Sequence, residues 1–230
     1  YISLNYIKKM YDKFTSIERL RYHLQKDPYK CLCSISGVGF KKADDMLLEI
    51  EKISNENIKN DKPPIIPFEN DLRTSAERCK ACLIYLLEEN ENNGNTQMNL
   101  ADLRSKCMAT TKECVDKFTD VLQDKVFYYN KELMEVSLRS TYAKEYSISK
   151  TLINALNHNI VWDVDIEKYR TNNNCKLTDE QLSVLDKIRQ YNVVILNGPA
   201  GSGKSASVQS ILVMLKDLKK SYKLFAPTGR

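Results

Sequence analysis

Near the end of the 230-residue chain, residues 198–205 read Gly198-Pro199-Ala200-Gly201-Ser202-Gly203-Lys204-Ser205. This octapeptide fits the phosphate-loop pattern G-x-x-x-x-G-K-[ST] at every position. The pattern is informative where a buried strand precedes it and a helix follows it, and both are expected here. Residues 193–196 form a continuous apolar run typical of a buried parallel strand, and apolar side chains recur at helical spacing over residues 208–218. The sequence therefore predicts a loop that binds a phosphorylated ligand.

The residue types in this loop suit a nucleotide and its magnesium ion. Glycines let the backbone amides of residues 200–205 surround a β-phosphate, because a Cβ atom would block the approach. The helix that follows directs its positive end at the same anion. Lys204 is expected to reach the β- and γ-phosphates, and the Ser205 hydroxyl is expected to coordinate Mg²⁺. All eight residues are therefore candidate ATP-binding residues, with Lys204 and Ser205 as the candidate catalytic pair.

Two short elements flank the loop. The upstream element, one helix before it, reads Leu177-Thr178-Asp179-Glu180-Gln181. The downstream element, on and after a second expected strand at residues 223–226, reads Phe225-Ala226-Pro227-Thr228-Gly229-Arg230. This layout resembles the RecD-like group of superfamily 1 DNA helicases. The resemblance implies that Gln181 contacts the adenine base, and that three residues lie near single-stranded DNA: Pro227, Thr228 and Arg230.

A second motif lies in the N-terminal part of the chain, where Asp27-Pro28 is expected to start one helix and a second helix is expected at about residues 41–53. It reads Leu32-x-x-Ile35-x-Gly37-Val38-Gly39-x-x-x-Ala43-x-x-Met46-Leu47, which matches a helix-hairpin-helix pattern. The two glycines are expected to form a tight turn whose amides bond a phosphate oxygen without base specificity. RecD-like helicases carry similar hairpins ahead of the motor. The candidate DNA-binding residues are Gly37, Val38, Gly39, Lys41 and Lys42.

The distribution of charge agrees with two polyanion-facing surfaces. Residues 1–43 hold nine Lys or Arg and three Asp or Glu, a net charge of +6, and residues 203–230 have a net charge of +5. The whole chain has a net charge of only +5, so the part between these ends is acidic. Basic ends favour a nucleic acid partner and a nucleotide. Solvated helix faces would account for the charge alone equally well.

The middle of the chain predicts a second, mainly helical region. Residues 55–67 are polar and rich in proline, which is typical of a linker. Expected helices then occupy residues 71–89, 100–107 and 111–123, with a β-hairpin at 126–129 and 133–138 and a helix at 142–157. This order resembles a winged-helix unit, although helix pairs with a hairpin also occur as plain packing modules.

These elements predict a multidomain protein. We expect a helix-hairpin-helix region at residues 1–62, a winged-helix-like domain at 68–165, and the start of a P-loop α/β (RecA-like) motor domain at 172–230. The sequence ends at Arg230, before any acidic strand-end motif or arginine finger, and hydrolysis requires both. This portion is therefore expected to hold parts of a nucleotide site without hydrolysing ATP by itself.

Seven cysteines are scattered along a chain that lacks the features of a secretory signal, so reduced thiols and a cytoplasmic location are expected. Cys79 and Cys82 form a C-x-x-C pair that could be half of a zinc site. Cys79 also falls on an apolar helical stripe, which favours a core position. Neither Cys107 nor Cys114 supplies a matching second pair in sequence. No run approaches the roughly 20 apolar residues of a membrane helix, so no membrane partner is expected.

The leading hypothesis is an ATP-dependent DNA helicase of the RecD-like type, with ATP and Mg²⁺ as cofactors. Single-stranded DNA and duplex junctions would be its partners, and any nuclease or repair partner is unidentified. Another P-loop NTPase, such as a small-molecule kinase or a clamp-loader-like ATPase, is a second hypothesis. A third is a DNA-binding adaptor with a vestigial phosphate loop. The intact Lys204-Ser205 pair argues against the third hypothesis, and the hairpin argues against the second.

Overall fold

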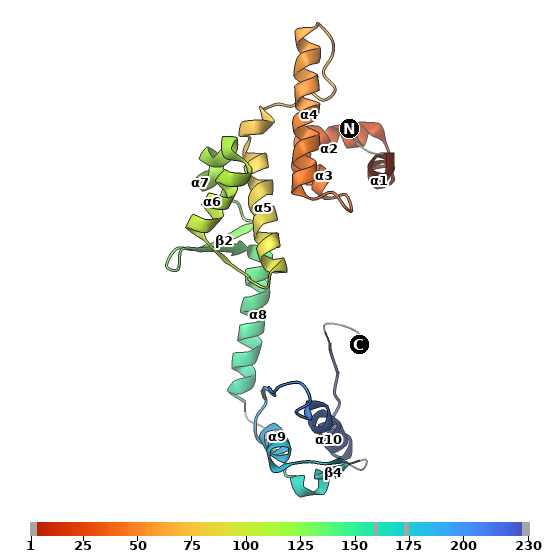
Figure 1. The fold of residues 1–230 in the computed structure, drawn as a ribbon, viewed down its shortest axis with the longest axis vertical. Helices are drawn as coiled ribbons and strands as arrows, with labels where there is room; N and C mark the ends of the chain where they lie inside the picture. The colour runs from red at the N-terminus through yellow and green to blue at the C-terminus, as the bar shows by residue number, and fades with distance from the viewer. Residues whose placement is uncertain (1–3, 159–160, 173–174, 227–230) are drawn as a thin grey trace. The chain divides into compact units, whose positions relative to one another are not determined.

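The computed structural model describes residues 4–158, 161–172 and 175–226. Of the described residues, 62% are helical. The chain divides into two compact units, Tyr1–Glu145 and Tyr146–Arg230, each of which has its own core (Figure 1). The predicted ranges 1–62 and 68–165 differ from this division, because residues from both ranges pack into the single core of the first unit.

The N-terminal half of the first unit is a set of four helices. They are α1 (Leu4–Phe14), α2 (Ile17–Lys26), α3 (Pro28–Cys33) and α4 (Phe40–Lys59). Asp27 caps α3 by accepting a hydrogen bond from the Lys30 amide, and Pro28 occupies the first helical position, as the Asp-Pro sequence predicts. Helix α4 runs six residues beyond the predicted end at residue 53, into the segment expected to be a linker.

The rest of the first unit combines helices with a small sheet. Its helical elements are η1 (Leu72–Thr74), α5 (Ala76–Asn92), α6 (Leu100–Thr110), η2 (Lys112–Lys117), α7 (Phe118–Val121) and the start of α8 (Arg139–Leu156). Its strands are β1 (Met98–Asn99), β2 (Phe127–Asn130) and β3 (Glu135–Leu138). They form an antiparallel sheet in the order β1-β3-β2, with Phe127 opposite Leu138 and Met98 opposite Val136. The hairpin β2–β3 is where the sequence predicts it, and the short strand β1 is an additional element.

The second unit is smaller. After the end of α8 it contains η3 (Ile166–Tyr169), β4 (Thr171–Asn172), β5 (Cys175–Lys176), α9 (Asp179–Gln190) and α10 (Lys204–Asp217). Strands β4 and β5 form an antiparallel pair. Its core is made by five buried side chains: Tyr169, Leu177, Leu182, Leu185 and Met214.

The predicted fold class requires correction. Residues 193–196 and 223–226, expected as parallel strands of a RecA-like α/β start, form no strand in the described structure. Ile195 is 89% exposed rather than buried, and so is Phe225. A parallel strand needs neighbouring strands to satisfy its backbone and helices to cover its faces, and neither run has such neighbours among the described residues. The described part of the chain is mostly helical, with a small three-stranded antiparallel sheet.

Within the residues that the structure describes, no helix combines the length and apolar character that a membrane crossing requires.

Candidate phosphate-binding loop and basic hairpin

The phosphate loop leads directly into helix α10. Gly203 is the N-cap of that helix and has a left-handed backbone, with φ 78° and ψ 19°. Gly201 also has a positive φ of 79°. Because the first amides of a helix have no partner one turn back, the Lys204 and Ser205 amides at the start of α10 can meet an anion, whereas the Ala206 amide already donates to the Gly203 carbonyl. This local geometry suits the phosphate-binding role predicted for residues 198–205.

The left-handed backbone favours glycine at position 203, and a side chain there would also meet a neighbour. A Cβ atom there would collide with the side-chain amide nitrogen of Gln181. At Gly198, a Cβ atom would lie 2.8 Å from the hydroxyl oxygen of Ser202, which is closer than real Cβ contacts. At both positions the contact is with the end of a side chain, which can move aside, so the backbone conformation is the stronger reason for glycine at position 203.

The Lys204 side chain folds back into the loop. Its ammonium donates hydrogen bonds to the carbonyl oxygens of Gly198 and Pro199, each at 2.6 Å. A phosphate that entered the loop would offer this ammonium oxygen acceptors carrying full negative charge, in exchange for neutral carbonyls. Ser205 is exposed in the first turn of α10, where its hydroxyl is accessible to a metal ion.

Gln181 connects helix α9 to the loop. Its side-chain oxygen accepts from the Thr178 amide at 3.0 Å, while the Thr178 hydroxyl accepts from the Gln181 amide at 3.3 Å, which completes a capping box. Its side-chain nitrogen donates to the Ser202 carbonyl at 3.3 Å. The structure therefore brings Gln181 and residues 198–205 together. The residues expected near the DNA strand, Pro227, Thr228 and Arg230, lie outside the described residues.

The N-terminal hairpin joins α3 to α4. Gly37 has a positive φ of 88°, so it takes the left-handed conformation that a tight turn requires. Gly39 differs from expectation: it is the N-cap of α4 with φ −85° and ψ 173°, and no atom lies within 4 Å of a Cβ placed there. Val38 is buried and donates its amide to the Ile35 carbonyl, so that amide is already used inside the protein.

The two lysines predicted to flank the hairpin take different directions. The Lys42 ammonium donates to the Tyr6 hydroxyl at 3.0 Å, beside the turn. This hydrogen bond lowers the pKa of the Tyr6 phenol. The Lys41 ammonium instead lies 5.5 Å from the ring centroid of Tyr85 on α5. The sequence gives no signal for Tyr6. This residue lies on helix α1 and contacts the hairpin only because the fold brings the two together.

The possible zinc half-site is part of the core. Cys79 and Cys82 on α5 are fully buried, as are Cys107 and Cys114. Among the described residues, no group of three or more His, Cys, Asp or Glu side chains is placed to hold a metal ion. The structure thus places Cys79 in the apolar stripe that its helical spacing predicts, beside Leu83.

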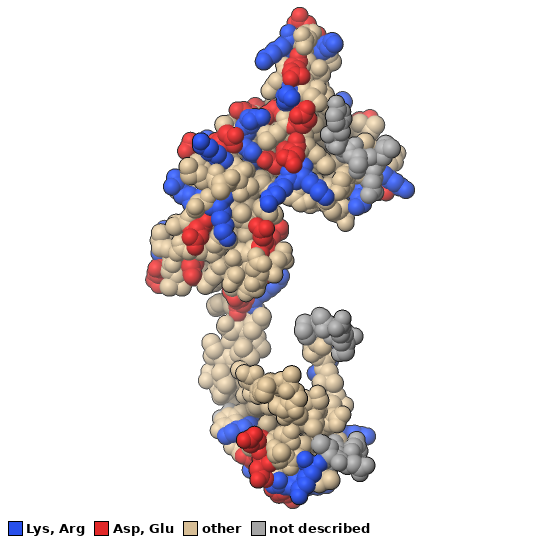
Figure 2. Space-filling model, in the orientation of Figure 1, with Lys and Arg blue, Asp and Glu red and all other residues tan. Residues whose placement is uncertain are grey.

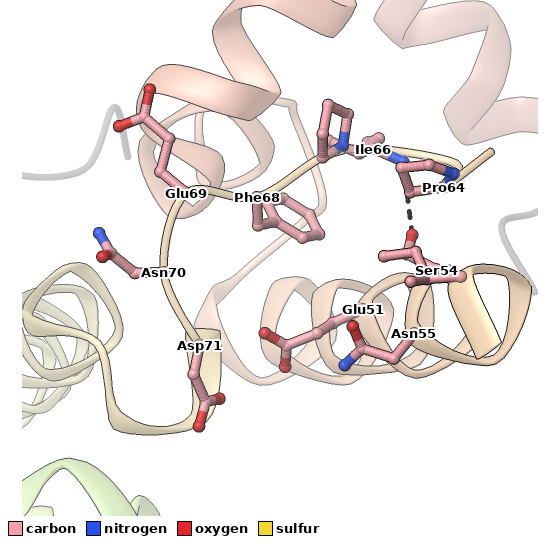
Figure 3. A pocket seen from close by; sticks show the side chains of 11 residues that line it. Glu51, Ser54, Asn55, Pro64, Ile66, Phe68, Glu69, Asn70 and Asp71 are labelled. Atoms are coloured by element: carbon pink, nitrogen blue, oxygen red, sulfur yellow. Dashed lines mark hydrogen bonds between the residues drawn. The ribbon is translucent and has the colours of Figure 1, made fainter.

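A separate cavity of about 340 Å³ lies between the second half of α4 and residues 64–71 (Figure 3). Ser54 accepts a hydrogen bond from the Ile66 amide at 3.4 Å on one side. Glu51 accepts from the Leu72 amide at 2.6 Å, and its burial raises the pKa of this carboxyl group. Glu51 already serves as a structural acceptor for the chain that leads to η1, so we assign no ligand to this cavity.

No protein-family model matches the chain. An uncharacterized protein of Methanocaldococcus jannaschii is similar, with 24% identity over 196 residues. The similar region covers 68% of this chain and 17% of that protein. The chain is thus similar to a small part of a much longer archaeal protein.

Proposed function

We propose that the protein containing this chain is an ATP-dependent DNA helicase, in which residues 198–205 bind the phosphates of ATP and the N-terminal hairpin holds DNA. The observation that carries the proposal is the loop: an intact phosphate-binding sequence with left-handed glycines, its lysine at the start of α10. The resemblance of residues 177–181 and 225–230 to RecD-like helicases selects DNA as the partner over other substrates of nucleotide hydrolases.

In this proposal each loop residue has a distinct task. The Lys204 ammonium leaves its two carbonyl partners and binds the β- and γ-phosphates, where it offsets negative charge during phosphoryl transfer. The Ser205 hydroxyl holds Mg²⁺. Gln181, which now contacts Ser202, links helix α9 to the occupancy of the loop.

The test is ATP hydrolysis by the full-length protein, measured without DNA, with single-stranded DNA and with duplex DNA. Single-stranded DNA should stimulate hydrolysis strongly and duplex DNA weakly. Lys204→Ala should lower the rate about a hundredfold or more, since one charged contact to the transferring group is worth roughly 3 kcal/mol. Lys216→Ala, in the last turn of the same helix, is the matched control and should retain the wild-type rate.

Each alternative has its own outcome. A kinase or another nucleotide hydrolase would show a rate indifferent to DNA, and an adaptor with a vestigial loop would show no hydrolysis to stimulate. Wild-type turnover by Lys204→Ala would overturn the assignment of the loop itself.

A further inference from the structure

Helix α1 places its lysines against the hairpin. The Lys9 ammonium donates to the Ser36 carbonyl at 2.9 Å, and the Lys13 ammonium donates to the Ser34 carbonyl at 2.6 Å. These two lysines are one helical turn apart, so they lie on the same face of α1. The Tyr6 hydroxyl, from the preceding turn of this helix, donates to the Gly37 carbonyl at 3.2 Å.

Lys42 completes the group from the other side of the turn. It donates to the Tyr6 hydroxyl at 3.0 Å and lies 3.5 Å from the Gly37 carbonyl oxygen. We call Tyr6, Lys9, Lys13 and Lys42 the basic rim. Helices α1, α2 and α3 gather beside α4 in Figure 1, so residues distant in sequence meet at this turn.

The charge of the basic rim is not neutralised inside the protein. Across the described part of the chain, no Asp or Glu forms an ion pair with Lys9, Lys13 or Lys42. An ammonium group has three hydrogen-bond donors, so Lys9 and Lys13 each keep donors free after bonding one carbonyl. Figure 2 shows basic and acidic side chains interspersed over the visible face. The basic rim is therefore identified by its hydrogen bonds at the turn, because the general surface charge does not single it out.

The N-terminal end of helix α4 adds positive electrostatic potential at the same turn. Its N-cap, Gly39, makes no side-chain capping bond, and the helix is 20 residues long. Its first amides and its positive end therefore face the turn that the lysines surround. Three ammonium groups and a helix N-terminus that meet at one turn match the spaced, singly charged phosphates of a nucleic acid backbone.

We propose that α1 belongs to the DNA site, with Lys9 and Lys13 binding phosphates next to the one held at the hairpin turn. This inference rests on the proposed DNA-binding function and adds residues that the hairpin motif does not contain. The competing explanation is structural. Ser34 is the C-cap of α3, so Lys13 could serve only to bond carbonyls at the end of that helix.

The experiment is a salt titration of DNA binding by the full-length protein without nucleotide, followed by fluorescence anisotropy of labelled single-stranded and duplex oligonucleotides. Removing one lysine–phosphate contact lowers the slope of log affinity against log salt by about 0.7 for single strands and 0.9 for duplex. The double variant Lys9→Gln, Lys13→Gln should therefore lower the slope by roughly 1.4 to 1.8. Lys8→Gln is the matched control, because Lys8 is exposed on the same helix and should leave the slope unchanged.

The remaining variants separate charge from structure. Lys9→Arg with Lys13→Arg keeps both charges and should keep the wild-type slope. If the double glutamine variant matches Lys8→Gln in a protein with unchanged circular dichroism, α1 is a structural clamp and the inference fails. If the glutamine variant unfolds, the arginine variant decides: a wild-type stability with a reduced slope would also overturn the inference. Salt-independent binding by the wild type would instead remove the proposed DNA site as a whole.

Discussion

Two glycine turns in this chain each lead into the N-terminus of a helix, and they are supported in different ways. The hairpin turn around Gly37 leads into α4, and the phosphate loop around Gly203 leads into α10. Both glycines have a positive φ. At the hairpin, the lysines that contact the turn come from two different helices, α1 and α4. At the phosphate loop, Lys204 and Gln181 contact the loop carbonyls and also carry the proposed chemistry.

The side-chain contacts that hold the two helices in place differ even more. Helix α4 is anchored by the buried Asp44, which accepts two hydrogen bonds from Arg78 at 2.8 and 2.9 Å and one from the Tyr29 hydroxyl at 2.7 Å. Helix α10 ends in an exposed pair between Lys168 and Asp217. At the hairpin, we therefore expect the residues that stabilise the fold to differ from those that bind the ligand. At the phosphate loop, we expect the same residues to do both.

The largest effect on stability is expected at the buried ion pair between Arg78 and Asp44. Arg78→Met should lower the free energy of unfolding of the first unit by about 3–5 kcal/mol, because it leaves the Asp44 carboxylate buried without its cation. Chemical denaturation, followed by a probe in the first unit, measures this destabilisation. Lys52→Met is the matched control. Lys52 forms an exposed ion pair with Glu49, with 3.9 Å between the charged atoms, and this pair should contribute less than about 0.5 kcal/mol to the free energy of unfolding.

The same variant tests whether nucleotide binding depends on this ion pair. At denaturant concentrations where the first unit stays folded, Arg78→Met should leave nucleotide affinity at the phosphate loop unchanged. A destabilisation below about 1 kcal/mol would mean that removing Arg78 does not leave Asp44 as an uncompensated buried charge.

The features that sequence predicts well are those fixed by local chemistry. The capping residue Asp27 starts a helix where expected, and Thr178 forms its capping box with Gln181. A cap needs only the side chain and the three or four residues that follow it, so the sequence contains the whole cause. The start of α10 directly after Gly203 follows the same rule, since the left-handed glycine and the helix start are set within a few residues.

The features that sequence misses depend on distant partners. An apolar tetrapeptide such as residues 193–196 becomes a strand only if other strands pair with it, and its own residues cannot supply them. Lys41 and Lys42 are adjacent, yet contact with Tyr85 holds one away from the hairpin while Tyr6 holds the other beside it. The sequence also predicts too early an end for α4, because residues 54–59 are polar and resemble a linker.

An intermediate effect is expected at the phosphate loop. Gly203→Val should weaken ATP binding by at least about tenfold, since a β-branched residue tolerates a φ of 78° poorly and its Cβ would displace Gln181. Equilibrium titration with a fluorescent ATP analogue measures the affinity. Gly94→Val is the control for backbone strain alone, because Gly94 has φ 88° with no atom near a Cβ placed there. Equal nucleotide affinity in the Gly203 variant and the wild type would show that the loop conformation does not determine binding.

The smallest effect separates the two glycines of the hairpin itself. Gly37→Ala should lower the free energy of unfolding by about 1–2 kcal/mol, the cost of a left-handed backbone for an ordinary residue. Gly39→Ala should change it by less than about 0.5 kcal/mol or raise it slightly, because Gly39 has a negative φ and alanine reduces the entropy of the unfolded chain. Neither change removes a lysine, so the salt dependence of DNA binding should stay at the wild-type slope in both. Denaturation of the two variants side by side measures the difference, and an equal destabilisation in both would mean that the turn needs two glycines, as its sequence alone suggests.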